Sequence, residues 1–137
     1  MRPPAPVALG DTHPPRTVGP LTITDIVRFA GAGGDFNPLH HDPAFAARAG
    51  FPAIIAHGQL TAGLLAAWVS DWFGVEHLRS FEVRFMAPVL VGDTLTLRGT
   101  VTELLPSTTG TLATVEVLVE KDAVVVKGKA QALVRAR

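Results

Sequence analysis

The sequence contains no cysteine. Disulfide bonds, thiolate zinc sites and a thiol nucleophile are therefore excluded, and the absence fits a cytoplasmic protein, which is the localisation we expect. An excess of charge of one sign is also lacking, because the 12 basic and 12 acidic residues balance to a formal net charge of zero. The basic residues are scattered apart from a short C-terminal cluster, so we expect no nucleic-acid partner.

Long hydrophobic runs are missing as well. The most apolar stretch, Leu60 to Val69, offers about ten residues before Asp71, whereas a membrane span needs roughly twenty. The first 20 residues are rich in proline and hold no continuous apolar segment after a charged start. We therefore expect no secretory signal, and we interpret residues 1–20 as an irregular N-terminal arm. A chain of 137 residues with 47% apolar residues predicts one domain, residues 1–137, with a sizeable core.

A first helix is predicted after residue 22. Thr22 and Asp25 have the spacing of a capping box, in which each side chain accepts a hydrogen bond from the other residue's backbone amide. Apolar residues at helical spacing follow over 26–30. The glycine-rich run 31–34 then predicts the end of this helix, because glycine is unfavourable inside a helix and readily takes positive φ at its end.

Two further helices are predicted downstream. Asp42 followed by Pro43 is typical of a helix start and predicts a short helix over residues 44–49. The longest helix is predicted over residues 59–73. It is apolar nearly all round, so other parts of the protein have to wrap it.

The C-terminal half alternates apolar and polar residues, which predicts four strands at about 81–86, 94–102, 115–120 and 124–135. The turns predicted between them, at 88–93, 106–110 and 121–122, are short enough to make neighbouring strands antiparallel. Helices followed by antiparallel strands predict an α+β fold, with the long apolar helix packed against the dry face of a curved sheet. The sheet edges need protection, so we expect a dimer that joins two sheets edge to edge.

The segment between the first two helices carries the residues best suited to chemistry. Asp35 and His40 lie five positions apart, and Pro38 between them prevents the preceding helix from continuing. We therefore expect an acid/base dyad on a connecting segment. Gly58 opens the longest helix, where it offers an unpaired amide at the positive end of the helix dipole and lets a ligand come close.

Two polar residues near these positions are given supporting roles. Asn37 is predicted to prop the loop through a bond from its side chain to local backbone. His57 is predicted to orient the turn before Gly58 through a backbone hydrogen bond, in preference to acting directly.

No metal site is predicted. His41 and Asp42 together could hold an ion, but Asp42 is better used as a helix cap, and no third ligand has suitable spacing. The remaining histidines, His13 and His77, are predicted to lie at the surface.

Two runs of the sequence carry a resemblance to a known family. The run FAGAGGDFNPLHHDPAFA, followed at the expected distance by AHG and a long apolar helix, resembles the MaoC-like dehydratases, also called R-specific enoyl-CoA hydratases, of the hot dog fold. The later run EVRFMAPVLVGDTL resembles the strand–turn–strand of the same family. The resemblance covers roughly residues 22–97, more than half of the chain.

The resemblance implies a reversible addition of water to a trans-2-enoyl thioester, which gives a (3R)-3-hydroxyacyl thioester. The acyl group would be carried on coenzyme A or acyl carrier protein, with no further cofactor. Asp35 and His40 match the family's catalytic carboxylate and histidine, and Gly58 matches the glycine whose amide holds the thioester oxygen. The chain departs from some members at Ala66, where they have a serine near the dyad, and this leaves the orientation of Asp35 or its water open.

Two other functions stay open. Other hot dog proteins are thioesterases, but those families place a carboxylate on or beside the central helix, and no acid lies between Gly58 and Ser70 here. The chain could also be a non-catalytic or co-catalytic partner subunit of a related dehydratase chain, although the intact dyad argues against a pure scaffold. The expected dimer pairs either two copies of this chain or this chain with a related hot dog chain.

Overall fold

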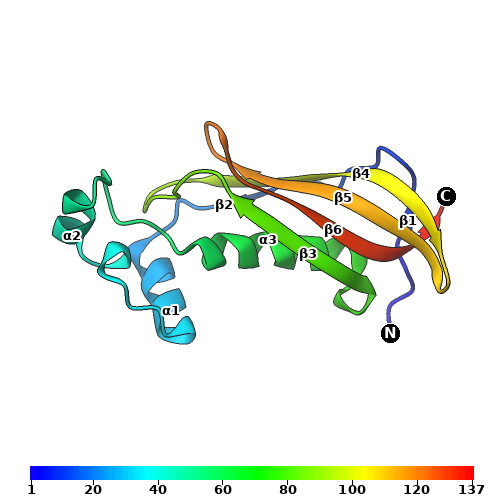
Figure 1. Cartoon of the computed structure of the whole chain (residues 1–137), viewed down its shortest axis with the longest axis horizontal. Coiled ribbons are helices and arrows are strands. Elements are labelled where there is room, and N and C mark those ends of the chain that lie inside the picture. The colour runs from blue at the N-terminus through cyan, green and yellow to red at the C-terminus, as the bar shows by residue number, and fades with distance from the viewer.

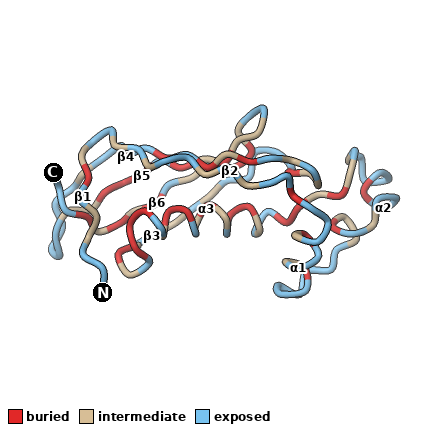
Figure 2. The backbone as a smooth tube through the Cα atoms, turned by 180° about the vertical axis from the view of Figure 1, so that it is seen from behind, coloured by how far each residue is buried: buried red, intermediate tan, exposed pale blue.

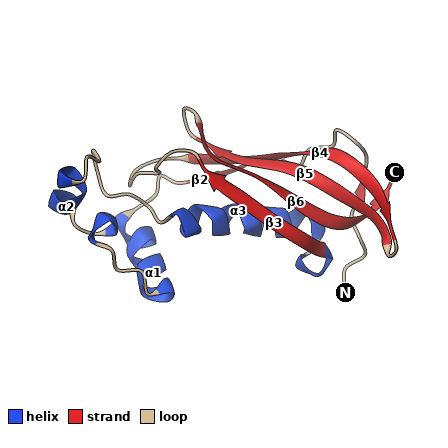
Figure 3. Cartoon of the chain, viewed as in Figure 1, coloured by secondary structure: helices blue, strands red, loops and turns tan.

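A computed structural model describes residues 1–137. The long helix α3 (Gly58–Phe73) lies lengthwise against a curved sheet, and both chain termini lie at one end of that sheet (Figure 1). Two shorter helices, α1 (Ile23–Gly33) and α2 (Pro43–Arg48), project beyond the opposite end (Figure 3). Two 3₁₀ turns, η1 (Pro38–His40) and η2 (Val75–His77), precede α2 and follow α3. None of the helices combines the length and hydropathy that a transmembrane helix requires.

The sheet consists of six strands: β1 (Pro6–Val7), β2 (Arg16–Val18), β3 (Leu78–Phe85), β4 (Leu95–Ser107), β5 (Gly110–Glu120) and β6 (Val124–Ala136). Their order is β1-β6-β5-β4-β2, and β3 pairs with β6. All pairs are antiparallel except β1 with β6. The predicted α+β fold, a central apolar helix against a curved antiparallel sheet, is confirmed.

The prediction of an irregular arm over residues 1–20 is wrong in part. This segment contains β1 and β2, which pair with β6 and β4, and Thr12 forms an isolated bridge with Thr100. The arm thereby satisfies backbone groups at strand edges that would otherwise be free. Strands of two and three residues are too short for alternation to reveal, because that signal needs about four residues.

Strands β4 and β5 are also longer than alternation predicts. Pro106, predicted in a turn, lies in β4 opposite Thr111, and the pairing continues to Ser107 and Gly110. The register shifts between Val101 and Glu103. Such a bulge changes the face on which the following side chains lie, so the apolar pattern breaks there although the strand continues.

The capping signals work as predicted. Thr22 Oγ1 accepts a hydrogen bond from the Asp25 amide at 3.1 Å, and Asp25 Oδ2 accepts one from the Thr22 amide at 2.9 Å. The bond from the Thr22 backbone holds the pKa of the Asp25 carboxyl below its usual value. Helix α1 ends at Gly34, whose φ of 70° is left-handed and whose amide donates to the Ala30 carbonyl. Asp42 caps α2.

Helix α3 buries one face against the sheet. In Figure 2, buried segments (red) lie along α3 and along the strands that it packs against. Gly99 of β4 makes room for this contact, because a Cβ there would lie 3.0 Å from the indole ring of Trp68. The opposite stripe of α3 is exposed and consists of Gln59, Gly63, Ala67 and Asp71. The helix is therefore wrapped on one side, and its open side carries small or polar residues.

The N-terminal arm packs on the C-terminal end of α3. The guanidinium of Arg2 donates to the backbone carbonyls of Asp71 and Trp72, which lack partners within the helix. A ring nitrogen of His77 lies 2.6 Å from the Arg2 carbonyl oxygen, and His77 is only 4% exposed. His13 stacks on Trp72 at 5.3 Å, and its partial burial lowers its pKa. The prediction that His13 and His77 lie at the surface is therefore wrong for His77, and His13 is half-buried.

We predict that Thr22→Ala lowers the free energy of unfolding by about 1 kcal/mol, because it removes the acceptor for the Asp25 amide. Urea unfolding measures this change. The matched control is Thr24→Ala in the same helix, since Thr24 is exposed and its hydroxyl forms no hydrogen bond. Equal destabilisation by both substitutions would contradict a capping role.

Candidate active site

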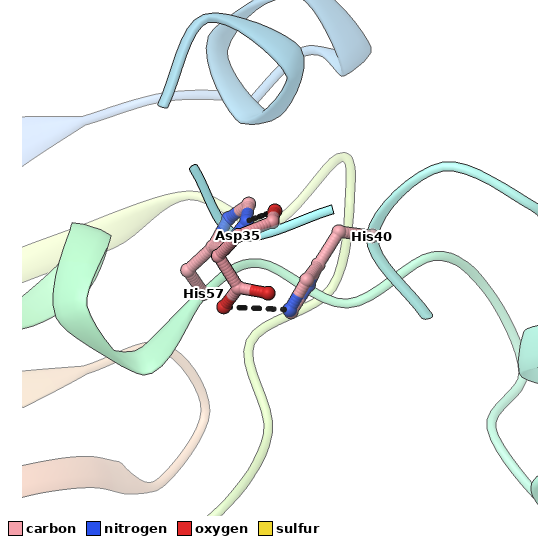
Figure 4. Close-up of side chains that lie close together, drawn as sticks. All are labelled: Asp35, His40 and His57. Carbon is pink, nitrogen blue, oxygen red and sulfur yellow. Dashed lines mark hydrogen bonds and ion pairs between the residues drawn. The ribbon is translucent and has the colours of Figure 1, made fainter. Parts of the chain in front are cut away.

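The structure brings Asp35, in the loop after α1, close to His40, the last residue of η1 (Figure 4). His40 Nε2 lies 3.7 Å from Asp35 Oδ2. The His40 side chain is 10% exposed and that of Asp35 is 54% exposed. The carboxylate is thus open to solvent, while the imidazole forms part of the protein wall.

The backbone fixes the proton position on His40. Its Nδ1 lies 2.8 Å from the carbonyl oxygen of Ile55, and a carbonyl oxygen only accepts hydrogen bonds, so Nδ1 carries the hydrogen. In the neutral ring the lone pair is then on Nε2, the nitrogen that faces Asp35. The position is suited to accepting a proton from a small molecule held beside the carboxylate.

His57, the N-cap residue of α3, joins the same cluster. Its ring stacks on that of His40 with the centroids 3.7 Å apart. The predicted backbone hydrogen bond is present, but its partner is the carbonyl oxygen of Asp35, 3.1 Å from His57 Nε2, and not the turn before Gly58. His57 therefore ties the loop of Asp35 to the start of α3.

Asn37 makes the local backbone bond predicted for it. Its Oδ1 accepts from the Leu39 amide at 3.0 Å and caps η1. The backbone N–H of Asn37 in turn donates to Asp35 Oδ1 at 3.3 Å. The loop thus holds its own carboxylate through short-range bonds. Ala66, half-buried in α3, contributes no hydroxyl, and its carbonyl accepts from Ser70 Oγ at 2.8 Å.

Gly58 begins α3 with a free backbone amide, since its N–H donates no hydrogen bond within the protein. It lines a cavity of about 320 Å³ together with residues 55–56, Thr61, the segment 85–89 and Val126. Asp35 and His40 do not line this cavity. They lie next to it, because His57, which precedes Gly58 in the chain, stacks on His40.

Phe85, at the end of β3, is a residue that the sequence patterns did not single out. Its ring covers Gly58 so closely that a Cβ on the glycine would lie 3.0 Å from two ring carbons. The residue is nevertheless 49% exposed. The alternation places Phe85 on the apolar face of its predicted strand, and only the fold shows that it is half exposed and faces the start of α3.

Asp35, His40 and His57 also form the group that could hold a metal ion, because their ligand atoms lie within 4.8 Å of one another. This group differs from the pair weighed from the sequence, His41 and Asp42, and spacing missed it because His57 lies far along the chain. The ring geometry does not fit an ion well. The two rings are inclined by only 22° with their centroids 3.7 Å apart, so their lone pairs lie in separate, nearly parallel planes, and one ion cannot lie close to both planes.

Known proteins similar to this chain belong to the family that its sequence resembles. Residues 5–126 match the model of the family described as MaoC like domain. The chain is 36% identical over 124 residues to an (R)-specific enoyl-CoA hydratase of Rhodospirillum rubrum, covering 85% of this chain and 82% of that protein. It is 42% identical over 81 residues to 3-hydroxyacyl-thioester dehydratase X of Mycobacterium tuberculosis, covering 59% of this chain and 28% of that protein.

The relatives differ in length from this chain, which spans only 28% and 56% of two curated relatives that it matches. Among solved structures, a chain of the ChsH1-ChsH2 complex from Mycobacterium tuberculosis is similar, with a TM-score of 0.81 and 28% identity over 93% of this chain and 98% of that chain. Similarity to solved hydratase and MaoC-like structures confirms the predicted hot dog fold. Because the family model matches residues 5–126, which is most of the chain, the chain belongs to the MaoC-like domain family.

Proposed function

We propose that this protein catalyses the reversible hydration of trans-2-enoyl thioesters to (3R)-3-hydroxyacyl thioesters. The observation that carries the proposal is the approach of His40 Nε2 to the Asp35 carboxylate at 3.7 Å, beside the free amide that opens α3. The names of the relatives, an (R)-specific enoyl-CoA hydratase and a 3-hydroxyacyl-thioester dehydratase, support the same reaction. The acyl carrier is coenzyme A or acyl carrier protein, and the protein itself uses no metal or other cofactor.

Hydration of a conjugated thioester needs a nucleophilic water at Cβ, a proton at Cα and a stabilised enolate oxygen between the two events. Asp35 and His40 hold the water between them. The water gives a proton to this dyad as its oxygen bonds to Cβ, and the electron pair of the double bond moves onto the thioester oxygen. The dyad then returns the proton to Cα, and dehydration runs the same steps in reverse. Each proton-transfer role contributes roughly 10² to 10⁴ in rate.

The enolate oxygen needs a hydrogen-bond donor that is already in place. The Gly58 amide meets this need, because it is unpaired and lies at the positive end of a helix of 16 residues. Its distance from the dyad is set by His57, which precedes it in the chain and contacts both members of the dyad.

A thioesterase is the weaker proposal for this site. The carboxylate that such an enzyme would need on the central helix is missing near the cavity. Asp71, the acid of α3, lies 13 residues after Gly58, roughly 20 Å along the helix, and pairs with Arg16 at 2.6 Å.

The protein is also proposed to work in the cytoplasm with a second hot dog chain, either a copy of itself or a related subunit. The long edge strand β3 pairs only with β6, so its other edge is free for another sheet. The solved relative described as a complex of ChsH1 with ChsH2 gives a precedent for two such chains together.

Asp35→Asn and His40→Ala, made separately, are each predicted to lower hydratase turnover by at least 10²-fold, since each removes one proton-transfer group. Loss of the conjugated absorbance of crotonyl-CoA, followed in the presence of EDTA, measures turnover. Thermal unfolding is expected to change little for Asp35→Asn, whose side chain is exposed.

The matched control is His41→Ala, a neighbouring exposed histidine, which should keep wild-type turnover. Full activity in either dyad variant would reject the assignment. Release of free thiol by the wild-type protein would indicate a thioesterase, and no reaction by the purified chain would favour a partner subunit.

Gly58→Ala is predicted to lower turnover strongly while the unfolding temperature stays nearly constant. The added methyl group would occupy the approach to the free amide and press on the Phe85 ring. Alanine also favours the helix by about 0.5–1 kcal/mol relative to glycine, which offsets the cost of that contact. Steady-state kinetics and thermal unfolding on the same samples measure both effects, and unchanged turnover would exclude the Gly58 amide as the oxygen site.

The proton positions of the two stacked histidines can be tested directly. When both imidazole rings are neutral, ¹⁵N NMR should show hydrogen on Nδ1 of His40 and on Nε2 of His57, because these nitrogens face backbone carbonyls. Hydrogen on Nε2 of His40 would remove the proton acceptor from the dyad and contradict the proposed mechanism. His41→Ala spectra provide the assignment control.

A further inference from the structure

One hydroxyl in the cavity wall has no partner. Thr61 is 1% exposed, and its Oγ1 forms no hydrogen bond within the protein. A buried polar atom without a partner lowers stability, so it is rare and needs an explanation. The only other such side-chain atom is Nδ1 of His57, at the start of the same helix.

The same helix shows the bond that a hydroxyl in a helix often makes, at the half-buried Ser70. Ser70 Oγ donates to the carbonyl of Ala66, four residues earlier, at 2.8 Å. The equivalent acceptor for Thr61 is the carbonyl of His57, which already accepts from the amides of Leu60 and Thr61. The Thr61 hydroxyl does not make this bond, and it is left without a partner in a residue that lines the cavity.

Its position relative to Gly58 is set by helical geometry. Residues three apart lie on the same face of a helix, and side chains lean toward the N-terminus, so the Thr61 side chain lies over the turn that Gly58 opens. Both residues line the same cavity, whose other walls are mainly apolar. Within that cavity wall, the free amide of Gly58 and the free hydroxyl of Thr61 are therefore neighbouring donors.

We propose that Thr61 is a further substrate-binding residue, whose hydroxyl donates a hydrogen bond to the thioester carbonyl oxygen beside the Gly58 amide. The inference rests on the proposed function and adds a second donor to it. As charge develops on the oxygen in the enolate, the bond strengthens, so the residue acts on the rate more than on ground-state binding. Phe85, which covers Gly58, lines the same cavity as the two donors.

The test compares Thr61→Val, which keeps the shape but removes the hydroxyl, with Thr61→Ser, which keeps the hydroxyl. Thr61→Val is expected to lower kcat for crotonyl-CoA by roughly 10²-fold with a smaller change in KM, as for loss of an oxyanion donor. Thr61→Ser is expected to stay within a few fold of wild type. The unfolding temperature of Thr61→Val should equal or exceed that of wild type, since the substitution removes an unpaired polar atom and no protein hydrogen bond.

Thr114→Val is the matched control. Thr114 is also buried, but it lies on β5 away from the cavity, and its hydroxyl accepts a hydrogen bond from Gln131. This variant should keep full turnover and lose some thermal stability, the reverse of Thr61→Val. Wild-type kcat in Thr61→Val overturns the inference, and so does an equal loss of kcat in Thr61→Val and Thr61→Ser, which would indicate a packing role.

A binding measurement separates this inference from the proposed function. Butyryl-CoA is a saturated thioester that cannot be hydrated, so its binding can be measured by calorimetry whether or not the chain hydrates crotonyl-CoA. Thr61→Val is expected to bind it about fivefold more weakly than wild type, the effect of one lost neutral hydrogen bond. Equal binding by the two proteins overturns the role of Thr61, whereas weaker binding with no wild-type turnover overturns only the hydratase proposal.

Discussion

The hydrogen bond from His57 to the backbone of Asp35 is the link on which the candidate site depends. It joins the start of α3, packed on the sheet, to a loop that projects beyond the sheet with α1 and α2. Two more bonds run beside it, from the Ile55 amide to the Leu39 carbonyl and from His40 Nδ1 to the Ile55 carbonyl. Without these three bonds, the projecting loop would have little to fix it relative to Gly58.

The arrangement gives the two members of the dyad different surroundings. The Asp35 side chain is 54% exposed and keeps much of its hydration, whereas His40 is buried against a second imidazole and a carbonyl. The two imidazole rings stack with their centroids 3.7 Å apart. His57, itself held by the Asp35 carbonyl, is therefore a fixed support for the ring of His40, which the proposed reaction uses as a proton acceptor.

The start of α3 departs from the rule that buried polar groups are paired. The side chain of His57 binds the loop of Asp35 and does not cap its own helix, so the first backbone amides of α3 stay free. The hydroxyl of Thr61, one turn further along α3, also has no partner. Elsewhere in the chain the equivalent groups are satisfied, as at the capping box of α1 and the side chain of Ser70. Unpaired donors gathered at one end of one helix are typical of a site kept for a ligand, where local stability is given up for binding.

The sequence by itself determined the features that depend on near neighbours: the capping box at Thr22, the helix start at Asp42, the apolar central helix and the alternating strands. It also placed Asp35 and His40 on one short loop, because proline and glycine restrict the local backbone. Only the tertiary structure decided which carbonyl His57 binds, that Phe85 covers Gly58, that the N-terminal arm pairs with β6 and β4, and that His77 is buried. These features join residues far apart in the chain, and propensity and periodicity describe only the residues within a few positions of each other.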